Sequence, residues 1–109
     1  MNKDNNVLQE LFDIVESRKV ANPDKSYVAK LFKKGRNKIA QKVGEEAAET
    51  IIAALKESKE NTVQESADLL FHLVVLWADK GVTPNRVFKE LKKRMGQSGL
   101  DEKAARKAK

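Results

Sequence analysis

Apolar residues recur at helical spacing along most of this chain. Near the N-terminus they fill one face of a helix, at i, i+3 and i+4 positions: Val7, Leu8, Leu11, Phe12 and Val15. This helix is expected to stop before Asn22-Pro23, because proline disfavours helical backbone at the preceding residue. A short second helix is predicted from the N-cap Ser26 to Lys34, with Gly35 at its end.

Three more helices follow by the same criterion. The third is predicted from about Asn37 to Leu55, and the fourth ends near Lys80-Gly81. Thr83-Pro84 supplies the N-cap and the first residue of a fifth helix, which ends at Gly96. The predicted inner face of this helix consists of Val87, Phe88, Leu91 and Met95. Residues 100–109 favour a short terminal helix. No β-type alternation occurs, so we predict an all-α fold in a single domain, residues 1–109.

Two pairs of carboxylates interrupt these apolar patterns. Glu46 and Glu49 lie in the third helix, and Glu65 and Asp68 lie in the fourth. Residues three apart are neighbours on a helix surface, so each pair directs two oxygen ligands to one place. Two such pairs on facing helices would bind a hard cation such as Mg²⁺, which prefers oxygen ligands and often shares substrate phosphates. The pattern is typical of a nucleotide-processing enzyme.

The fourth helix is the more informative of the two. Glu65, Asp68 and His72 fall within about 60° of one another on a helix, and apolar side chains cover nearly all the rest. A helix that is apolar all round is buried, where carboxylates are costly unless paired or metal-bound. The alternative is an exposed strip on a half-buried helix. His72 is either a hydrogen-bonded structural residue or an outer partner that orients Asp68.

The third helix is ambiguous by itself, because the motif EExxE also suits a solvated surface. Glu46 and Glu49 project about 60° apart, whereas Glu45 lies about 100° from Glu46. Glu45 is therefore the candidate for a catalytic role, accepting a proton from the attacking water, or for helping a second cation. The predicted metal ligands are Glu46, Glu49, Glu65 and Asp68.

The start of the fourth helix decides whether the two pairs can meet. Thr62 followed by Glu65 matches a capping box, which would use Glu65 structurally. Ser58 is the competing N-cap, and with a third helix ending near Leu55 it places both pairs about 9–14 Å from the turn. The metal-site hypothesis therefore predicts that Ser58, not Thr62, begins the helix.

Composition limits the other possibilities. The 109 residues are 40% hydrophobic, enough for a modest core that small domains often extend by oligomerising, and Ile51, Ile52 and Leu55 spread over a wide arc. The absence of cysteine excludes disulfides and thiolate metal sites. The N-terminus is polar, and the longest apolar run is too short to span a bilayer, so we expect a cytoplasmic protein without membrane contact.

The net charge of +6 is concentrated in two basic groups. One precedes the acidic motif (Lys30, Lys33, Lys34, Arg36, Lys38, Lys42), and the other occupies the C-terminal part, including Lys89, Lys92, Lys93 and Arg94. Such a balance suits an anionic partner, either a small polyphosphate or nucleic acid, although a solvated surface is the alternative for residues 101–109. A nucleic-acid-binding protein leaves Glu65 and Asp68 unexplained, so we expect no nucleic-acid partner.

The acidic motifs and their surroundings resemble a known family. EExxE (45–49) followed by ExxD (65–68) resembles the metal-binding signature of the all-α, MazG-like nucleoside triphosphate pyrophosphatases. Residues 26–50, 65–77 and 90–107 look like the phosphoribosyl-ATP pyrophosphohydrolases of histidine biosynthesis, so the resemblance covers nearly the whole chain. It implies a MazG-like bundle of four to five helices, completed by oligomerisation into a homodimer or larger assembly with active sites at helical interfaces.

The resemblance also implies an activity. Family members hydrolyse phosphoribosyl-ATP to phosphoribosyl-AMP and pyrophosphate with Mg²⁺, by attack of water on the α–β phosphate linkage. Their metal carboxylates carry over to the four predicted ligands, and their basic and hydroxyl positions match Ser26, Tyr27, Lys30, Lys34, Lys38 and Lys42. Charge on the leaving pyrophosphate would be stabilised by Lys38, Lys42 or Arg94. The alternative is a house-cleaning (d)NTP pyrophosphatase, because the acidic motif binds metal and phosphate but not the base.

Overall fold

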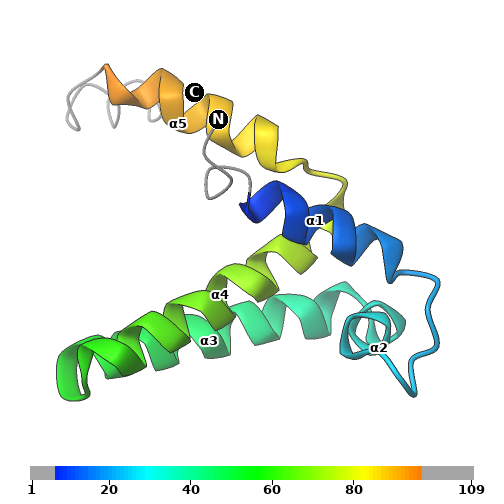
Figure 1. Ribbon diagram of the computed structural model, residues 1–109, viewed down its shortest axis with the longest axis horizontal. Helices are drawn as coiled ribbons and strands as arrows, with labels where there is room; N and C mark the ends of the chain where they lie inside the picture. The colour runs from blue at the N-terminus through cyan, green and yellow to red at the C-terminus, as the bar shows by residue number, and fades with distance from the viewer. Residues whose placement is uncertain (1–6, 97–109) are drawn as a thin grey trace.

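A computed structural model describes residues 7–96, which form five α-helices without a strand. Figure 1 shows α1 (Val7–Ser17), α2 (Tyr27–Lys34), α3 (Arg36–Lys56), α4 (Lys59–Lys80) and α5 (Pro84–Met95). The predicted all-α fold is confirmed. The helix expected within residues 100–109 lies outside the described part of the chain. Within residues 7–96, none of the helices has the length and apolar composition that a bilayer crossing requires.

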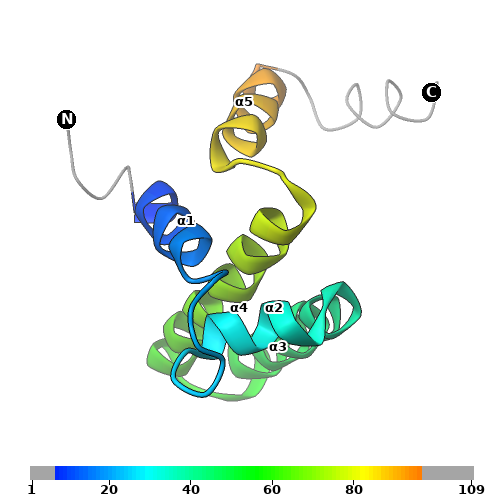
Figure 2. The same ribbon diagram turned by 90° about the vertical axis from the view of Figure 1, so that its right-hand side faces the viewer.

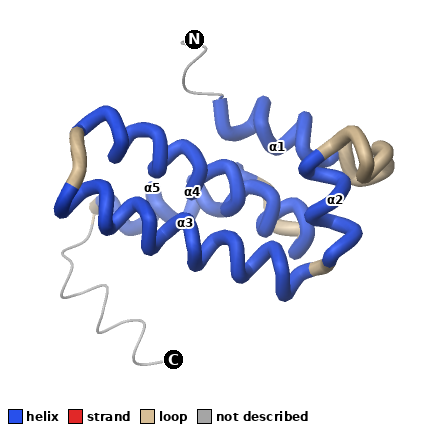
Figure 3. The backbone as a smooth tube through the Cα atoms, turned by 90° about the horizontal axis from the view of Figure 1, so that it is seen from below, coloured by secondary structure: helices blue, strands red, loops and turns tan. Residues whose placement is uncertain are grey.

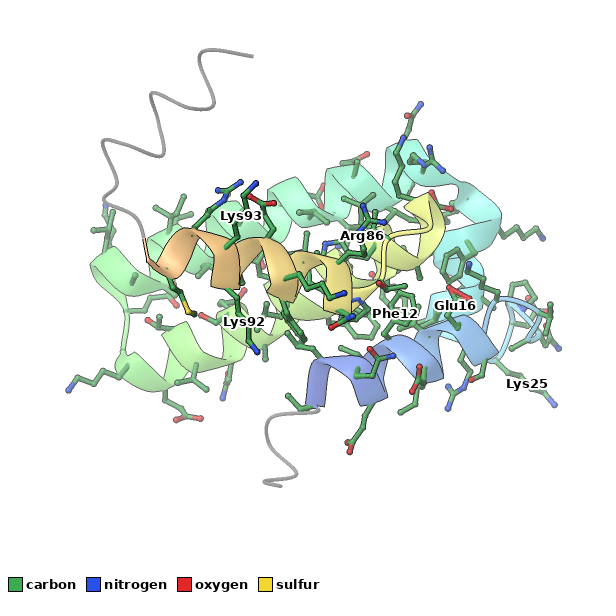
Figure 4. All side chains as sticks on the ribbon, turned by 90° about the horizontal axis from the view of Figure 1, so that it is seen from above. Phe12, Glu16, Lys25, Arg86, Lys92 and Lys93 are labelled. Carbon is green, nitrogen blue, oxygen red and sulfur yellow. The ribbon has the colours of Figure 1, made fainter. Side chains whose placement is uncertain are left out.

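The long hairpin of α3 and α4 is the framework of the fold. The two helices run side by side in opposite directions (Figures 1 and 3). α2 packs on α3, and α1 packs on α4 (Figure 2). The largest fully buried side chains of the hydrophobic core are Val15, Ile39, Val74 and Val75. Phe12 of α1, labelled in Figure 4, belongs to the same core. The core therefore lies where the start of α3 and the second half of α4 meet the first two helices.

The fifth helix differs from its predicted packing. Leu91 and Met95, placed by the sequence on an inner face, are 51% and 80% exposed, because α5 extends away from the hairpin and packs mainly on α1. Ile51, Ile52 and Leu55, which spread over a wide arc of α3, are exposed. Completion of the bundle by a second copy stays a prediction.

Both ends of the hairpin are fixed by polar contacts. Ser58 is the N-cap of α4, since its hydroxyl accepts from the Asn61 N–H at 3.0 Å, whereas the Thr62 hydroxyl donates to the Ser58 carbonyl at 3.0 Å. At the other end, Arg36 Nε donates to Asp79 Oδ2 at 2.6 Å and its Nη2 donates to the Asp79 carbonyl at 3.1 Å. The helix start that the metal-site hypothesis requires is confirmed.

We expect Ser58→Ala to lower the free energy of unfolding by about 1 kcal/mol, because it removes the side-chain acceptor at the N-cap of α4. Urea unfolding followed by circular dichroism measures this change. Thr62→Ala is the matched control and should cost less, since its hydroxyl only adds a second donor to a carbonyl within the helix. A larger loss from Thr62→Ala would contradict this assignment of the cap.

Candidate metal centre

Three carboxylates converge between α3 and α4. One oxygen each from Glu46, Glu49 and Glu65 lies within 4.8 Å of the other two, and this is the only such group of acidic or histidine ligands found among residues 7–96. Glu46 is buried, Glu65 is half-buried and Glu49 is exposed, so the group connects the helix interface with solvent. A cavity of about 330 Å³ adjoins it, lined by Glu49, Ile52, Glu57 and Glu65.

Two oxygens of this group lack a donor. Oε2 of Glu46 and Oε2 of Glu65 are buried without a hydrogen-bond partner in the described structure. Glu49 cannot satisfy them while all three groups are ionised, because a carboxylate has no proton to donate. Lys42 Nζ lies 3.9 Å from the other oxygen of Glu46 and 3.3 Å from Glu45. Since buried polar atoms are costly when unpaired, these oxygens fit a bound hard cation.

Burial and mutual repulsion raise the pKa values of two of these carboxyl groups. Burial raises the pKa of Glu46 above its ordinary value, and the neighbouring Glu49 carboxyl raises it further. The pKa of Glu65 is raised first by a hydrogen bond to the Glu49 carboxyl and then by burial. The Asp68 charge raises both pKa values as well. The group therefore favours an added proton or cation over the bare charges.

Asp68 is close to this group without belonging to it. Its side chain is exposed, and its carboxylate is not among the three whose oxygens converge. Its charge nevertheless acts on Glu46 and Glu65. The geometry thus brings together three of the four predicted ligands and leaves the fourth beside them.

Thr50 joins the two helices at the level of the carboxylates. Its hydroxyl lies 2.8 Å from the Glu46 carbonyl and 3.1 Å from the Glu65 carbonyl, so one proton is shared between the backbones of two candidate ligands. Sequence reasoning missed Thr50. The position of Thr50, four residues after Glu46, could have indicated its hydrogen bond to the Glu46 carbonyl. Its second acceptor, the Glu65 carbonyl, depends on how α3 and α4 are aligned.

Glu45 occupies a different environment. Gln41 Nε2 donates to its Oε2 at 2.8 Å, and hydrogen bonds from Gln41 and Lys42 hold the pKa of Glu45 below its ordinary value. The Lys38 charge contributes in the same direction. Glu45 is exposed and lies outside the three-carboxylate group, whereas Lys42 contacts both. Its catalytic role stays a prediction.

His72 is buried and bonded through both ring nitrogens. Nδ1 lies 2.8 Å from the Asp68 carbonyl, and Nε2 lies 2.8 Å from the Tyr27 hydroxyl. A carbonyl only accepts, so in the neutral ring Nδ1 carries the proton and Nε2 accepts from Tyr27. His72 therefore contacts the Asp68 backbone, and these two bonds leave no nitrogen for the Asp68 carboxylate. Sequence reasoning did not pair His72 with Tyr27.

Arg94 is not brought to the carboxylates by this chain. Its Nε donates to Glu90 Oε2 at 3.0 Å within α5, and α5 packs mainly on α1. Lys92 and Lys93 project from the same helix (Figure 4).

We expect Glu46→Gln to raise the melting temperature of the metal-free protein at neutral pH. The raised pKa of Glu46 means that its ionised form destabilises the fold, and glutamine removes that charge. The gain should shrink as the pH falls through the raised pKa, and vanish below the ordinary value of 4.5, where the wild-type carboxyl is also neutral.

Thermal unfolding by circular dichroism across this pH range provides the measurement. Glu45→Gln is the control: its pKa is lowered in the fold, so removing its charge should leave the melting temperature unchanged or reduce it. A Glu46→Gln protein that melts below the wild type at neutral pH would show that its carboxylate is not repelled.

Comparison with known proteins shows the family of this chain. The profile of the family described as phosphoribosyl-ATP pyrophosphohydrolase matches residues 8–95. A protein of Paramagnetospirillum magneticum, named phosphoribosyl-ATP pyrophosphatase, is 58% identical over 97% of this chain and 97% of its own length. Relatives of the same name in Rhodospirillum rubrum and Azospirillum brasilense are 59% and 55% identical, over 93% and 94% of this chain and 86% and 92% of their own. The chain belongs to the phosphoribosyl-ATP pyrophosphohydrolase family.

Proposed function

We propose that this protein hydrolyses phosphoribosyl-ATP to phosphoribosyl-AMP and pyrophosphate, the second step of histidine biosynthesis. The observation that carries the proposal is the convergence of Glu46, Glu49 and Glu65 around two buried oxygens without donors. Such a site suits a cation that grips polyphosphate, and relatives over 50% identical are named for this activity. The names favour this reaction over the house-cleaning alternative.

We propose Mg²⁺ as the cation, held by Glu46, Glu49 and Glu65, with Asp68 as the adjacent fourth ligand. All of these groups offer carboxylate oxygens, the ligands that Mg²⁺ prefers. When bound, Mg²⁺ would neutralise phosphate charge and lower the pKa of a coordinated water. The donor set supports a hard cation, because the described chain offers no sulfur and no free imidazole nitrogen at this point.

Basic side chains nearby support the departure of pyrophosphate. Lys42 lies beside Glu45 and Glu46, and Lys38 is one helical turn before it on α3. Their ammonium groups are suited to stabilise negative charge on the leaving group. Glu45 stays the proposed acceptor of a proton from the attacking water. The contacts with Gln41 and Lys42 that lower its pKa keep it ionised but also make it a weaker base.

We further propose that two or more copies complete the bundle. Ile51, Ile52 and Leu55 on α3, and Leu91 and Met95 on α5, are at least half exposed. Covering them would remove apolar area from water, and a second copy is the occupant that the family resemblance implies. This arrangement is also the route by which Arg94 would reach a site. We also propose a cytoplasmic location, because the proposed substrate is a highly charged nucleotide.

We expect Glu49→Gln to reduce turnover by at least about 100-fold, because it removes the exposed ligand of the group while sparing the core. Pyrophosphate release from phosphoribosyl-ATP with Mg²⁺ is the measurement, and circular dichroism confirms the helical content. Glu60→Gln is the matched control: it makes the same charge change in the exposed first turn of α4 and should keep full activity. Full activity in Glu49→Gln would remove this residue from the mechanism.

The activity itself is tested with a substrate panel. Phosphoribosyl-ATP, ATP and the four dNTPs are compared at equal concentration, each with Mg²⁺ and with EDTA. We expect metal-dependent cleavage of phosphoribosyl-ATP far above that of the others. Preferential cleavage of dNTPs would instead assign the protein to the house-cleaning group, and cleavage that persists in EDTA would contradict the metal site.

A further inference from the structure

Tyr27 holds an aromatic ring in a fixed orientation against His72 and Phe71 of α4. It is the first residue of α2, and its hydroxyl lies 2.8 Å from His72 Nε2 on α4. Its ring lies edge-on to His72, with centroids 5.7 Å apart and planes at 81°. Phe71 stacks against it with centroids 6.1 Å apart and planes at 23°. These contacts fix both the direction and the tilt of the ring.

About half of the surface of Tyr27 faces solvent. Tyr27 is 48% exposed although its hydroxyl is bonded to the buried His72 and one side lies against Phe71. Phe71 and His72 therefore do not enclose the ring. A rigid tyrosine with an open face loses little conformational freedom when a flat ligand covers it, because its rotamer is already fixed.

The open ring is close to the charged site. Burial raises the pKa of Tyr27, the positive charge of Lys42 lowers it, and the charges of Glu46, Glu45 and Asp68 raise it. The phenol is therefore within electrostatic reach of the acidic group on α3 and α4. Through His72 it is also only one side chain away from the Asp68 backbone.

We propose that Tyr27 is the platform on which the purine base of the substrate stacks. This inference rests on the proposed function, in which the carboxylates hold the metal and phosphates of an adenine nucleotide. A base joined to those phosphates by one ribose needs a π-face at short range, and Tyr27 presents one. Stacking of a base on an aromatic side chain changes affinity by about tenfold when the ring is removed.

Two variants separate this role from packing. Tyr27→Phe keeps the ring and removes the bond to His72, whereas Tyr27→Leu keeps apolar volume and removes the ring. Two probes are titrated into each protein with Mg²⁺ by calorimetry. One is α,β-methylene-ATP, which carries the base and resists cleavage, and the other is tripolyphosphate, which has no base.

We expect Tyr27→Leu to weaken α,β-methylene-ATP about tenfold and to leave tripolyphosphate affinity within twofold of the wild type. Tyr27→Phe should bind both probes nearly as the wild type does. Equal weakening of both probes in Tyr27→Leu, or unchanged binding of α,β-methylene-ATP, would overturn the proposal. Absence of α,β-methylene-ATP binding by the wild type would overturn it too. Failure of the proposed function is read separately, as a wild type that binds these probes without cleaving phosphoribosyl-ATP.

Discussion

Three carboxylates held close together repel one another, and the contacts between α3 and α4 have to offset this repulsion. Glu46, Glu49 and Glu65 would separate if α3 and α4 were free to slide or splay. The hairpin prevents this with an N-cap at Ser58, a shared proton at Thr50 and a bidentate contact from Arg36 to Asp79. The three carboxylates are thus kept in an arrangement that a bound cation would stabilise.

The large buried apolar side chains and the three carboxylates lie in different parts of the hairpin. The fully buried side chains Ile39, Val74 and Val75 lie where α1 and α2 cover the hairpin, away from the turn at Ser58. Apolar burial there supplies the favourable free energy of folding, which the unfavourable electrostatics of the carboxylates reduce. The half of the hairpin near the turn carries the cavity beside Glu49 and Glu65. This division explains how so small a chain tolerates a buried glutamate at Glu46.

Much of this arrangement was predictable from local sequence. The helical periods, the caps at Ser26 and Thr83 and the proline at Pro84 act within a few residues, so their effect can be read directly. Three of the four predicted ligands converge because their i, i+3 spacing and the short turn fix their direction and depth. Asp68 lies beside the group, since a helix period gives the direction of a residue but not the conformation of its side chain.

Contacts between distant segments were not predictable in the same way. The bond between Tyr27 and His72 depends on how α2 crosses the hairpin, and Thr50 finds Glu65 only once α3 and α4 are aligned. The exposure of Leu91 and Met95 has the same origin, because an amphipathic pattern shows that a face needs cover without showing what supplies it.

The connection between α3 and α4 has a consequence for how the protein acquires its site. Only Glu57 and Ser58 separate the end of α3 from the start of α4, so all the candidate metal ligands belong to one continuous helical hairpin. Contacts between neighbouring segments form faster than those between remote ones, because less chain entropy is lost in closing them. We therefore expect the three carboxylates to come together early in folding, and a cation present at that stage would act on the folding pathway as well as on the folded protein.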